Sequence, residues 1–287
     1  MNKMRKAIQS LQAMLAILTL VCASLVSLTA CSDDKHEYEI LKPISEHLIG
    51  RWMDVDGYMV DENGNKIEDE KNGLHGYVMI RDFQPDGRCI LIKTDPEGWQ
   101  RMTTAAWKVD QEETGYHIMM GGTDYFSPIH KLTADYLITS TNSAYDETTG
   151  QIVEGTFHFE HRKVPDEPTL AERLVGMWRF ENTYEKVNGE WRVKNYNYSL
   201  EAWREFKDNG RVVGEQTYAD QTEEYECDWK INTRTGELSM YDEYQDVTGR
   251  LELVDDDTML LYYNEDYDFV TGEVSFGEFK DVLIRVK

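Results

Sequence analysis

The second half of this 287-residue chain repeats the first, and this repeat constrains the fold more than any other feature. Leu48-Ile-Gly-Arg-Trp52 returns as Leu174-Val-Gly-Met-Trp178. Phe83-Gln-Pro-Asp-Gly-Arg88 returns as Phe206-Lys-Asp-Asn-Gly-Arg211. Self-similarity at one long spacing is typical of a duplicated structural unit. We therefore expect two homologous domains.

The spacing between matching residues changes along the repeat and then becomes constant. It is 126 residues from Gly50 to Gly176, and 122 residues from Trp107 to Trp229 and at every later match. Differences in loop length are therefore confined to the first half of each copy.

The repeat also predicts where the domains begin and end. The first domain spans 45–164 and the second spans 169–287, with a linker at 165–168. Pro165 and Pro168 both lie in that linker, and proline stiffens a connection because its ring fixes φ. The linker should restrict the relative orientation of the two domains.

Each copy has the sequence pattern of short antiparallel strands. Trp107-Lys-Val-Asp110 alternates apolar and polar residues, which is typical of a half-buried strand. Asp86-Gly87 and Asn209-Gly210 are strong hairpin signals and predict type I′ turns. Further Thr-Gly pairs mark more turns, and this density of turns predicts about eight strands per copy, in a barrel or sandwich.

A short helix should precede each copy. Thr169-Leu-Ala-Glu172 is a capping box, in which the threonine caps the first amides and the glutamate bonds back. Ser45-Glu-His47 occupies the matching position in the first copy.

Several of these motifs resemble those of lipocalins. The Gly50-x-Trp52 and Gly176-x-Trp178 pairs match the lipocalin signature after a short helix. The two Asp/Asn-Gly-Arg hairpins and Lys131–Leu137 resemble bacterial lipocalin-like domains, which are often found in tandem on exported lipoproteins of Bacteroidota. The resemblance implies an all-β chain of two tandem small lipocalin-like antiparallel β-barrels, each preceded by a short helix.

The resemblance also implies a role for the repeated tryptophan of each copy. In lipocalins it closes the base of the barrel and packs under a basic residue from near the end of the domain. Lys163 and Arg285 hold that position here. We expect a cation–π contact in each copy, with a structural role.

The N-terminal residues have the pattern of a secretory signal peptide. Lys3, Arg5 and Lys6 precede an apolar stretch from Ala13 to Val26. The predicted signal peptide is 1–30, and the alternatives are an ordinary secretory signal without lipid or an uncleaved anchor.

The end of this segment resembles the bacterial lipobox. Leu28-Thr-Ala-Cys31 implies cleavage before Cys31 and diacylglycerol on its thiol, with 31–44 as a tether. Ser32-Asp-Asp34 resembles the surface-export signal of Bacteroidota lipoproteins, although short acidic runs are also ordinary solvated tether. We expect a lipid anchor in the outer membrane, facing the cell surface.

The charge of the chain restricts its partners. The formal net charge is −24, and loss of the three basic residues of the signal peptide takes it to −27. Such a body is repelled by phosphate backbones, which argues against nucleic-acid binding. The membrane is therefore expected to be a partner through the lipid anchor alone.

No pattern in the sequence predicts catalysis. Motifs for nucleophilic hydrolases, zinc proteases and phosphate-binding loops are absent, and no cofactor is expected. In His158-Phe-Glu-His161, strand geometry puts His161 on the face opposite to His158 and Glu160, so we expect solvated side chains and no metal. Asp61–Asn65 and Asp255–Asp257 are predicted to be turns rather than calcium loops. Cys89 and Cys227 are expected to be buried thiols.

Two binding functions remain. A non-catalytic module for a small apolar ligand would use a barrel interior, whose Met79, Met119, Met120, Met240 and Met259 either fill a packed core or line a cavity. The alternative is a surface glycan- or protein-binding or scaffold lipoprotein. Its candidate residues are Trp99, Trp191 and Trp203, which fall outside the repeated tryptophan positions, with Trp99 on a predicted loop.

Overall fold

The computed structural model describes residues 43–67, 76–110, 112, 114–146, 150–196, 200–219, 221–243, 246–268 and 270–287. The predicted signal peptide, Cys31 and nearly all of the tether lie outside the described residues. Residues 43–287 belong to one compact unit. Nearly all of its regular structure is β-strand, as the alternating pattern predicts.

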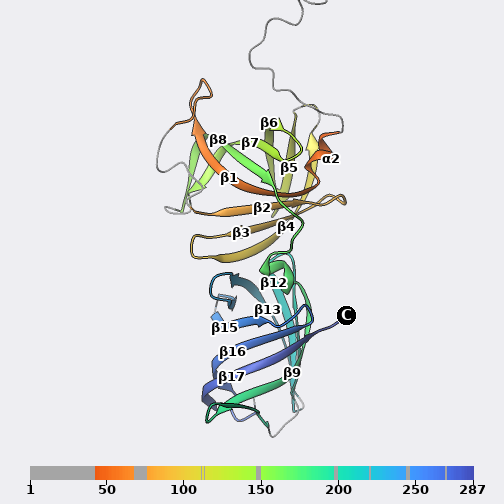
Figure 1. Ribbon diagram of the computed structural model, residues 1–287, viewed down its shortest axis with the longest axis vertical. Coiled ribbons are helices and arrows are strands. Elements are labelled where there is room, and N and C mark those ends of the chain that lie inside the picture. The colour runs from red at the N-terminus through yellow and green to blue at the C-terminus, as the bar shows by residue number, and fades with distance from the viewer. Residues whose placement is uncertain are drawn as a thin grey trace, which may run out of the picture. The chain divides into compact units, whose positions relative to one another are not determined.

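The first eight strands form a closed antiparallel barrel (Figure 1). Each strand pairs with the next, and β8 pairs back to β1. The elements are α2 (Ile44–Leu48), β1 (Gly50–Val60), β2 (Val78–Phe83), β3 (Arg88–Thr94), β4 (Trp99–Asp110), β5 (Gly115–Met120), β6 (Thr123–Leu132), β7 (Tyr136–Asp146) and β8 (Gln151–Lys163). We call this part the N-terminal barrel.

The remaining strands continue the antiparallel pairing. The strands from β11 to β17 pair in sequence order, while β9 pairs with β10, β11 and β17. The elements are α3 (Leu170–Leu174), β9 (Gly176–Val187), β10 (Glu190–Val193), β11 (Leu200–Phe206), β12 (Arg211–Tyr218), β13 (Gln221–Asn232), β14 (Glu237–Tyr241), β15 (Asp246–Leu253), β16 (Thr258–Tyr267) and β17 (Val274–Arg285). We call this part the C-terminal strands.

The short helices and the repeated tryptophans make the same contacts in both parts. Trp52 Nε1 donates to the carbonyl of Leu48 at 2.8 Å, and Trp178 Nε1 donates to the carbonyl of Leu174 at 2.8 Å. The capping box predicted at Thr169 is present. Each helix is therefore fixed to the first strand that follows it.

The predicted cation–π contacts are confirmed. Lys163 Nζ lies 5.1 Å from the centre of the Trp52 ring, and Arg285 Cζ lies 4.2 Å from the centre of the Trp178 ring. Arg285 also donates to the carbonyl of Val175 at 2.7 Å, which ties the end of the chain to the end of α3. These residues stabilise the fold and leave the two tryptophans fully buried.

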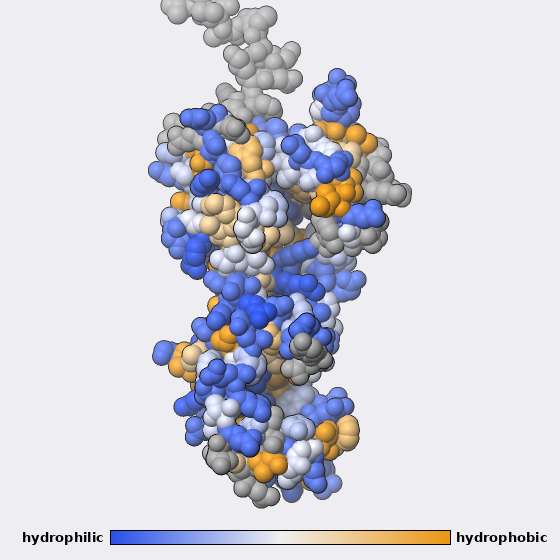
Figure 2. Space-filling view, turned by 180° about the vertical axis from the view of Figure 1, so that it is seen from behind, coloured by the Kyte–Doolittle hydropathy of each residue, from blue (hydrophilic) through white to orange (hydrophobic). Residues whose placement is uncertain are grey.

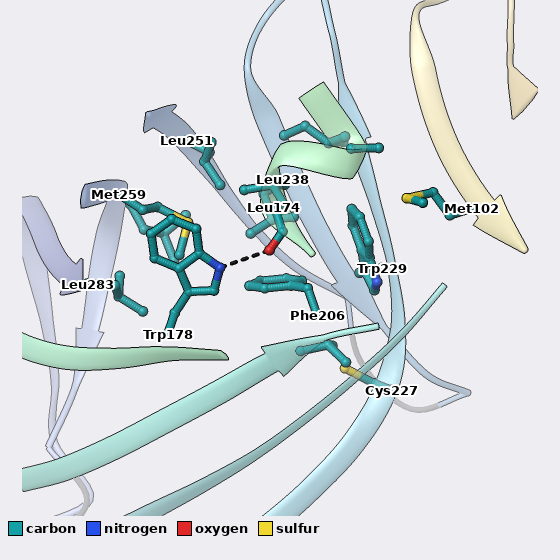
Figure 3. Packing of buried hydrophobic residues seen from close by; sticks show 14 of the residues in the cluster. Met102, Leu174, Trp178, Phe206, Cys227, Trp229, Leu238, Leu251, Met259 and Leu283 are labelled. Carbon is teal, nitrogen blue, oxygen red and sulfur yellow. Dashed lines mark hydrogen bonds between the residues drawn. The ribbon is translucent and has the colours of Figure 1, made fainter. Parts of the chain in front are cut away.

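Each part has its own buried aromatic cluster. In the N-terminal barrel it includes Trp52, Phe83 and Trp107. In the C-terminal strands Trp178, Phe206 and Trp229 lie close together, and Figure 3 also shows the hydrogen bond from Trp178 to Leu174. Cys89 and Cys227 are buried free thiols, as predicted, and burial raises the pKa of Cys89 to about 12.

The N-terminal barrel contributes to the C-terminal core. Ile92 and Met102 belong to the cluster of the C-terminal strands, and Figure 3 shows Met102 approaching Trp229 from a separate strand. Strand β4 also pairs with β13 at Gln100 and Ile231. The two parts are therefore joined by apolar packing and by a short strand pairing.

The two predicted hairpins exist, but the predicted turn type is wrong. Gly87 has φ of 86° and Gly210 has φ of 82°, while Asp86 and Asn209 do not have positive φ. Three residues separate Gln84 from Arg88, whose backbones are paired, with Gln84 N donating to Arg88 O at 2.8 Å. This is a three-residue loop with a glycine in the left-handed region, which type I turns with a bulge require.

Candidate functional site

A cavity of about 1130 Å³ lies among the C-terminal strands. It is as large as cavities that hold small organic molecules. Its lining comes from β9, β11, β12, β14, β15, β16 and β17, with Trp191 of β10 and Tyr196. Among the lining side chains are Phe180, Thr183, Arg204, Gln216, Leu238, Met240, Val247, Leu261, Tyr263, Asp266, Phe279 and Asp281.

The floor of the cavity follows from strand alternation. Side chains two residues apart on a strand point to the same face of the sheet. A residue two positions along a strand from a buried core residue therefore lies on the core face, next to that residue, where it can form the floor of the cavity. Trp178, Phe206, Leu238, Met259 and Leu283 are buried in the core. The cavity-lining residues two positions from them are Phe180, Arg204, Met240, Leu261 and Asp281. The floor thus combines three apolar side chains with one cation and one carboxyl group.

Arg204 is the cation on this floor. It pairs with Trp178 across the β9–β11 ladder, so it lies beside that fully buried tryptophan on the same face of the sheet. Among the described residues its guanidinium has no ion-pair partner, and it contacts Met240 Sδ at 4.0 Å. The guanidinium has five N–H donors, and its contact with the Met240 sulfur, a weak acceptor, leaves most of them available to the cavity.

Asp281 is the carboxyl group on the floor. Its Oδ1 accepts hydrogen bonds from Thr183 Oγ1 at 2.7 Å and from the Tyr263 hydroxyl at 2.8 Å. Burial raises the pKa of Asp281, since a charged carboxylate there loses its hydration. Two hydroxyl groups bind this side chain directly, and the nearby positive charge of Arg204 opposes the effect of burial on its pKa.

A second carboxylate in the lining is paired. Asp266 accepts from Lys194 Nζ in a short contact and from the Tyr196 hydroxyl at 2.9 Å. Its charge is therefore neutralised by a lysine next to the cavity.

The strands that line one side of the cavity separate from each other. The β15–β16 ladder joins Arg250–Leu253 to Met259–Tyr262 and goes no further. Beyond it, β15 pairs with β14 and β16 pairs with β17. Val247 lines the cavity at this divergence and is half exposed.

The N-terminal barrel contains a buried polar network in place of such a floor. Arg81 makes a short ion pair with Asp54. His161 Nδ1 lies 2.7 Å from Asp54 Oδ1, and His161 Nε2 lies 2.9 Å from Thr139 Oγ1. Burial alone would raise the pKa of Asp54, but the charge of Arg81 and the bond to His161 hold it below its usual value. Burial lowers the pKa of His161, so the ring is neutral and donates Nδ1–H to the carboxylate.

The chain from Asp54 through His161 to Thr139 has the order of a nucleophilic triad. His161 is 0% exposed and Thr139 is 2% exposed, so no substrate reaches the hydroxyl. The network therefore holds the barrel interior together. The predicted solvation of His161 is wrong, although its placement opposite to Glu160 is right: Glu160 is half-buried and accepts from the Tyr58 hydroxyl at 3.2 Å.

The three candidate tryptophans do not form one site. Trp99 begins β4 rather than lying on a loop, so that expectation is wrong, and Lys230 Nζ sits 4.6 Å from its ring. Trp191 lines the cavity. Trp203 pairs with Arg179, on the face opposite to Arg204. Cys31, the predicted lipid attachment point, lies outside the described residues.

The acidic loops are turns, as predicted. Asp61 Oδ1 accepts from the backbone amides of Asn63 and Asn65, both at 2.8 Å. Asp255 Oδ1 accepts from the amide of Asp257 at 2.9 Å. In the stretches that the structure describes, no group of three His, Cys, Asp or Glu side chains is placed to hold a metal ion.

Sequence reasoning missed Arg204 and Asp281. The available signal was position: Arg204 is two residues before Phe206 on a strand, so a charged side chain falls on the core face. A charge on that face requires either a partner or a cavity.

Comparisons with known proteins identify no family for this chain. The sequence matches no protein-family model, and no curated protein matches it. A solved structure of a protein of unknown function from the DUF3598 family of Nostoc punctiforme is similar, with 11% identity, a TM-score of 0.25, and coverage of 86% of this chain and 100% of that one. Over the described residues, no helix is both long and apolar enough to cross a membrane.

Proposed function

We propose that this protein is a lipid-anchored, non-catalytic binding protein of the outer membrane, built from two tandem lipocalin-like barrels. The C-terminal barrel would hold a small, largely apolar ligand in its cavity, and the N-terminal barrel would be filled by its own side chains. The single observation that carries the proposal is the cavity of about 1130 Å³ above a buried aromatic base.

Matching pairings support the proposal of two barrels. Trp52 pairs with Arg81 across β1 and β2, and Trp178 pairs with Arg204 across β9 and β11. The strand ring closes through β8 and β1 in one part and through β17 and β9 in the other. β10 is an added strand on the edge of β9.

We propose that the protein is not an enzyme because its candidate catalytic groups are either buried or already hydrogen-bonded. The triad-like chain in the N-terminal barrel is sealed from solvent, as its exposures show. In the cavity, the carboxyl group of Asp281 is committed to two hydroxyl groups. Neither arrangement offers a free nucleophile next to a base.

The alternative of glycan or protein binding at the surface has less support. Trp99 is engaged by Lys230, and Trp203 lies on another face of the sheet from the cavity. The face in Figure 2 is largely hydrophilic, with apolar residues in small, scattered groups. Extended apolar patches are what usually mark a docking surface.

The ligand proposal is tested by titrating the protein, without its signal peptide, with an apolar fluorescent probe and reading the emission of the probe. We expect saturable binding at one site, and loss of binding when Leu261→Trp fills the cavity. The matched control is Leu137→Met, a conservative change in the core of the N-terminal barrel, which should leave binding intact. No saturable binding of apolar probes to the intact protein would refute the proposal.

The anchor is tested separately. Expression of the full chain in bacteria fed radiolabelled palmitate should label the wild-type protein and not Cys31→Ser. Membrane fractionation then shows whether the protein is in the outer membrane. Protease treatment of whole cells shows whether it faces the cell surface. An unlabelled wild-type protein would contradict the lipid anchor and leave the ligand proposal standing.

A further inference from the structure

The two parts of the chain contain the same interior arginine in opposite states. Arg81 and Arg204 are 123 residues apart, the spacing that also separates Phe83 from Phe206. Both arginines pair with the repeated tryptophan, Arg81 with Trp52 and Arg204 with Trp178. They are therefore equivalent positions of the repeated fold.

Arg81 is neutralised by a carboxylate of the protein. Asp54 supplies a carboxylate in direct contact, and His161 lies 3.3 Å from Arg81 Nη1. The charge of Asp54 raises the pKa of Arg81 against the opposing effect of burial, so the ion pair is retained inside the barrel. In this barrel, the arginine beside the repeated tryptophan is therefore paired with a carboxylate of the protein itself.

The equivalent groups around Arg204 are apolar. The spacing of 126 places Phe180 where Asp54 stands, and the spacing of 122 places Leu283 where His161 stands. Leu261 takes the place of Thr139 by the same spacing of 122. The counter-ion and its supporting hydrogen bonds are thus replaced, while the arginine is kept.

Asp281 does not take over the role of Asp54. It is bound by Thr183 and Tyr263, and no ion pair with Arg204 forms within the described residues. Its position corresponds to Phe159 in the first copy, on the opposite edge of β1 from Arg81. Arg204 therefore presents its guanidinium to the cavity with its charge uncompensated by direct contact.

We propose that the cavity binds an apolar molecule ending in a carboxylate, with Arg204 forming the ion pair that Asp54 forms with Arg81. This proposal rests on the proposed ligand-binding function and names the ligand class. A guanidinium matches a carboxylate with two parallel N–H···O bonds, a geometry that a neutral alcohol cannot reproduce. Phe180 and Leu261 of the floor, with Phe279, provide the apolar surface for the remainder of the molecule.

The experiment compares two ligands of equal length, dodecanoate and 1-dodecanol, by competition against an apolar fluorescent probe at pH 7.5. We expect the dissociation constant of dodecanoate to be about tenfold lower than that of the alcohol. The reason is that the carboxylate would form charge-assisted hydrogen bonds with Arg204, which the alcohol cannot form. Arg204→Met should bring the two affinities together by weakening dodecanoate alone. Arg179→Met, the same change at an exposed arginine of β9, should leave the preference intact.

A second variant restores the arrangement of the N-terminal barrel. Phe180→Asp places a carboxylate where Asp54 stands, and it should abolish the preference for dodecanoate by supplying an internal counter-ion. Equal affinity of the unmodified protein for both ligands would overturn this proposal while leaving the ligand-binding function intact. Failure of both ligands to bind would overturn both. Because the comparison of the two ligands uses the wild-type protein, it holds even where a variant is destabilised.

Discussion

Arg51 of the N-terminal barrel and Glu172 of helix α3 form a two-pronged ion pair, although 121 residues separate them. Arg51 Nη1 lies 2.6 Å from Oε1, and Nη2 lies 2.9 Å from Oε2. The same glutamate closes the capping box by accepting from the amide of Thr169 at 2.7 Å. One carboxylate therefore both starts the helix and joins it to the preceding barrel.

Replacing Arg51 with methionine should destabilise the protein. The arginine is nearly fully buried, so its loss leaves a half-buried carboxylate without its cation. Removing one partner of a buried pair costs about 3 kcal/mol, and we expect the free energy of unfolding in urea to fall by roughly that amount. Arg88→Met is the control, since its pairs with Asp86 and Asp208 are exposed and should contribute less than about 1 kcal/mol. Equal effects of the two changes would show that the junction is not stabilised by this pair.

The bond from Trp178 to the helix should also be measurable. Trp178→Phe keeps an aromatic ring under Arg285 but leaves the Leu174 carbonyl without its donor. A buried group left unpaired, together with the lost ring volume, costs about 2–3 kcal/mol. Trp203→Phe is the control, because Trp203 is half-buried on the other face of β11 and the change should cost less than Trp178→Phe. Urea unfolding followed by circular dichroism measures both, and a silent Trp178→Phe would mean that α3 is held by packing alone.

Acid should weaken the protein through His161. Burial lowers the pKa of His161 below the 6.5 of an unfolded chain. Between these two pKa values the unfolded chain binds more protons, so stability falls as pH falls, by up to about 1.4 kcal/mol per pH unit for one proton. His161→Gln should flatten the loss of stability between pH 7 and pH 5.

The control for that experiment is a histidine on the outer face. Burial and the neighbouring His130 also lower the pKa of His158. His158 is only half-buried, whereas His161 is fully buried, so His158→Gln should flatten the slope less. An unchanged slope in His161→Gln would mean that the histidine ionises without unfolding the barrel.

The sequence predicts the positions of the strands better than the contents of the interior. Trp107 and Trp229 follow a simple alternation that places them in the cores, where both are found. The stacked cations Lys163 and Arg285 are expected from the resemblance of the repeated Gly-x-Trp pairs to the lipocalin signature, and both contacts are present. Local pattern is enough for the buried tryptophans, since their position depends on side-chain direction along one strand.

The interior network and the cavity depend on several strands at once. Asp54, Arg81 and His161 belong to β1, β2 and β8, and only the closed barrel brings them together. A register shift between Asp54 and Asp56 also interrupts the alternation of β1, so a strict period of two fails beyond that point. The divergence of β15 from β16 has no sequence signal of its own, because it reflects which partner each strand follows.

Asp281→Asn tests whether the counter-ion of Arg204 is Asp281 or the carboxylate of a ligand. Burial raises the pKa of Asp281 above its unfolded value of 3.8, so between these values the folded protein binds more protons and stability falls as pH rises. Asparagine keeps an oxygen that accepts from Thr183 and Tyr263 but has no charge to desolvate. We therefore expect the variant to unfold at higher urea concentration than the wild type at pH 7, with the gain vanishing below pH 3.8. Dodecanoate should also bind the variant more tightly, since a negative charge near Arg204 is gone. A variant less stable than the wild type at pH 7 would instead identify Asp281 as the counter-ion of Arg204, in which case no ligand carboxylate is needed to neutralise the arginine.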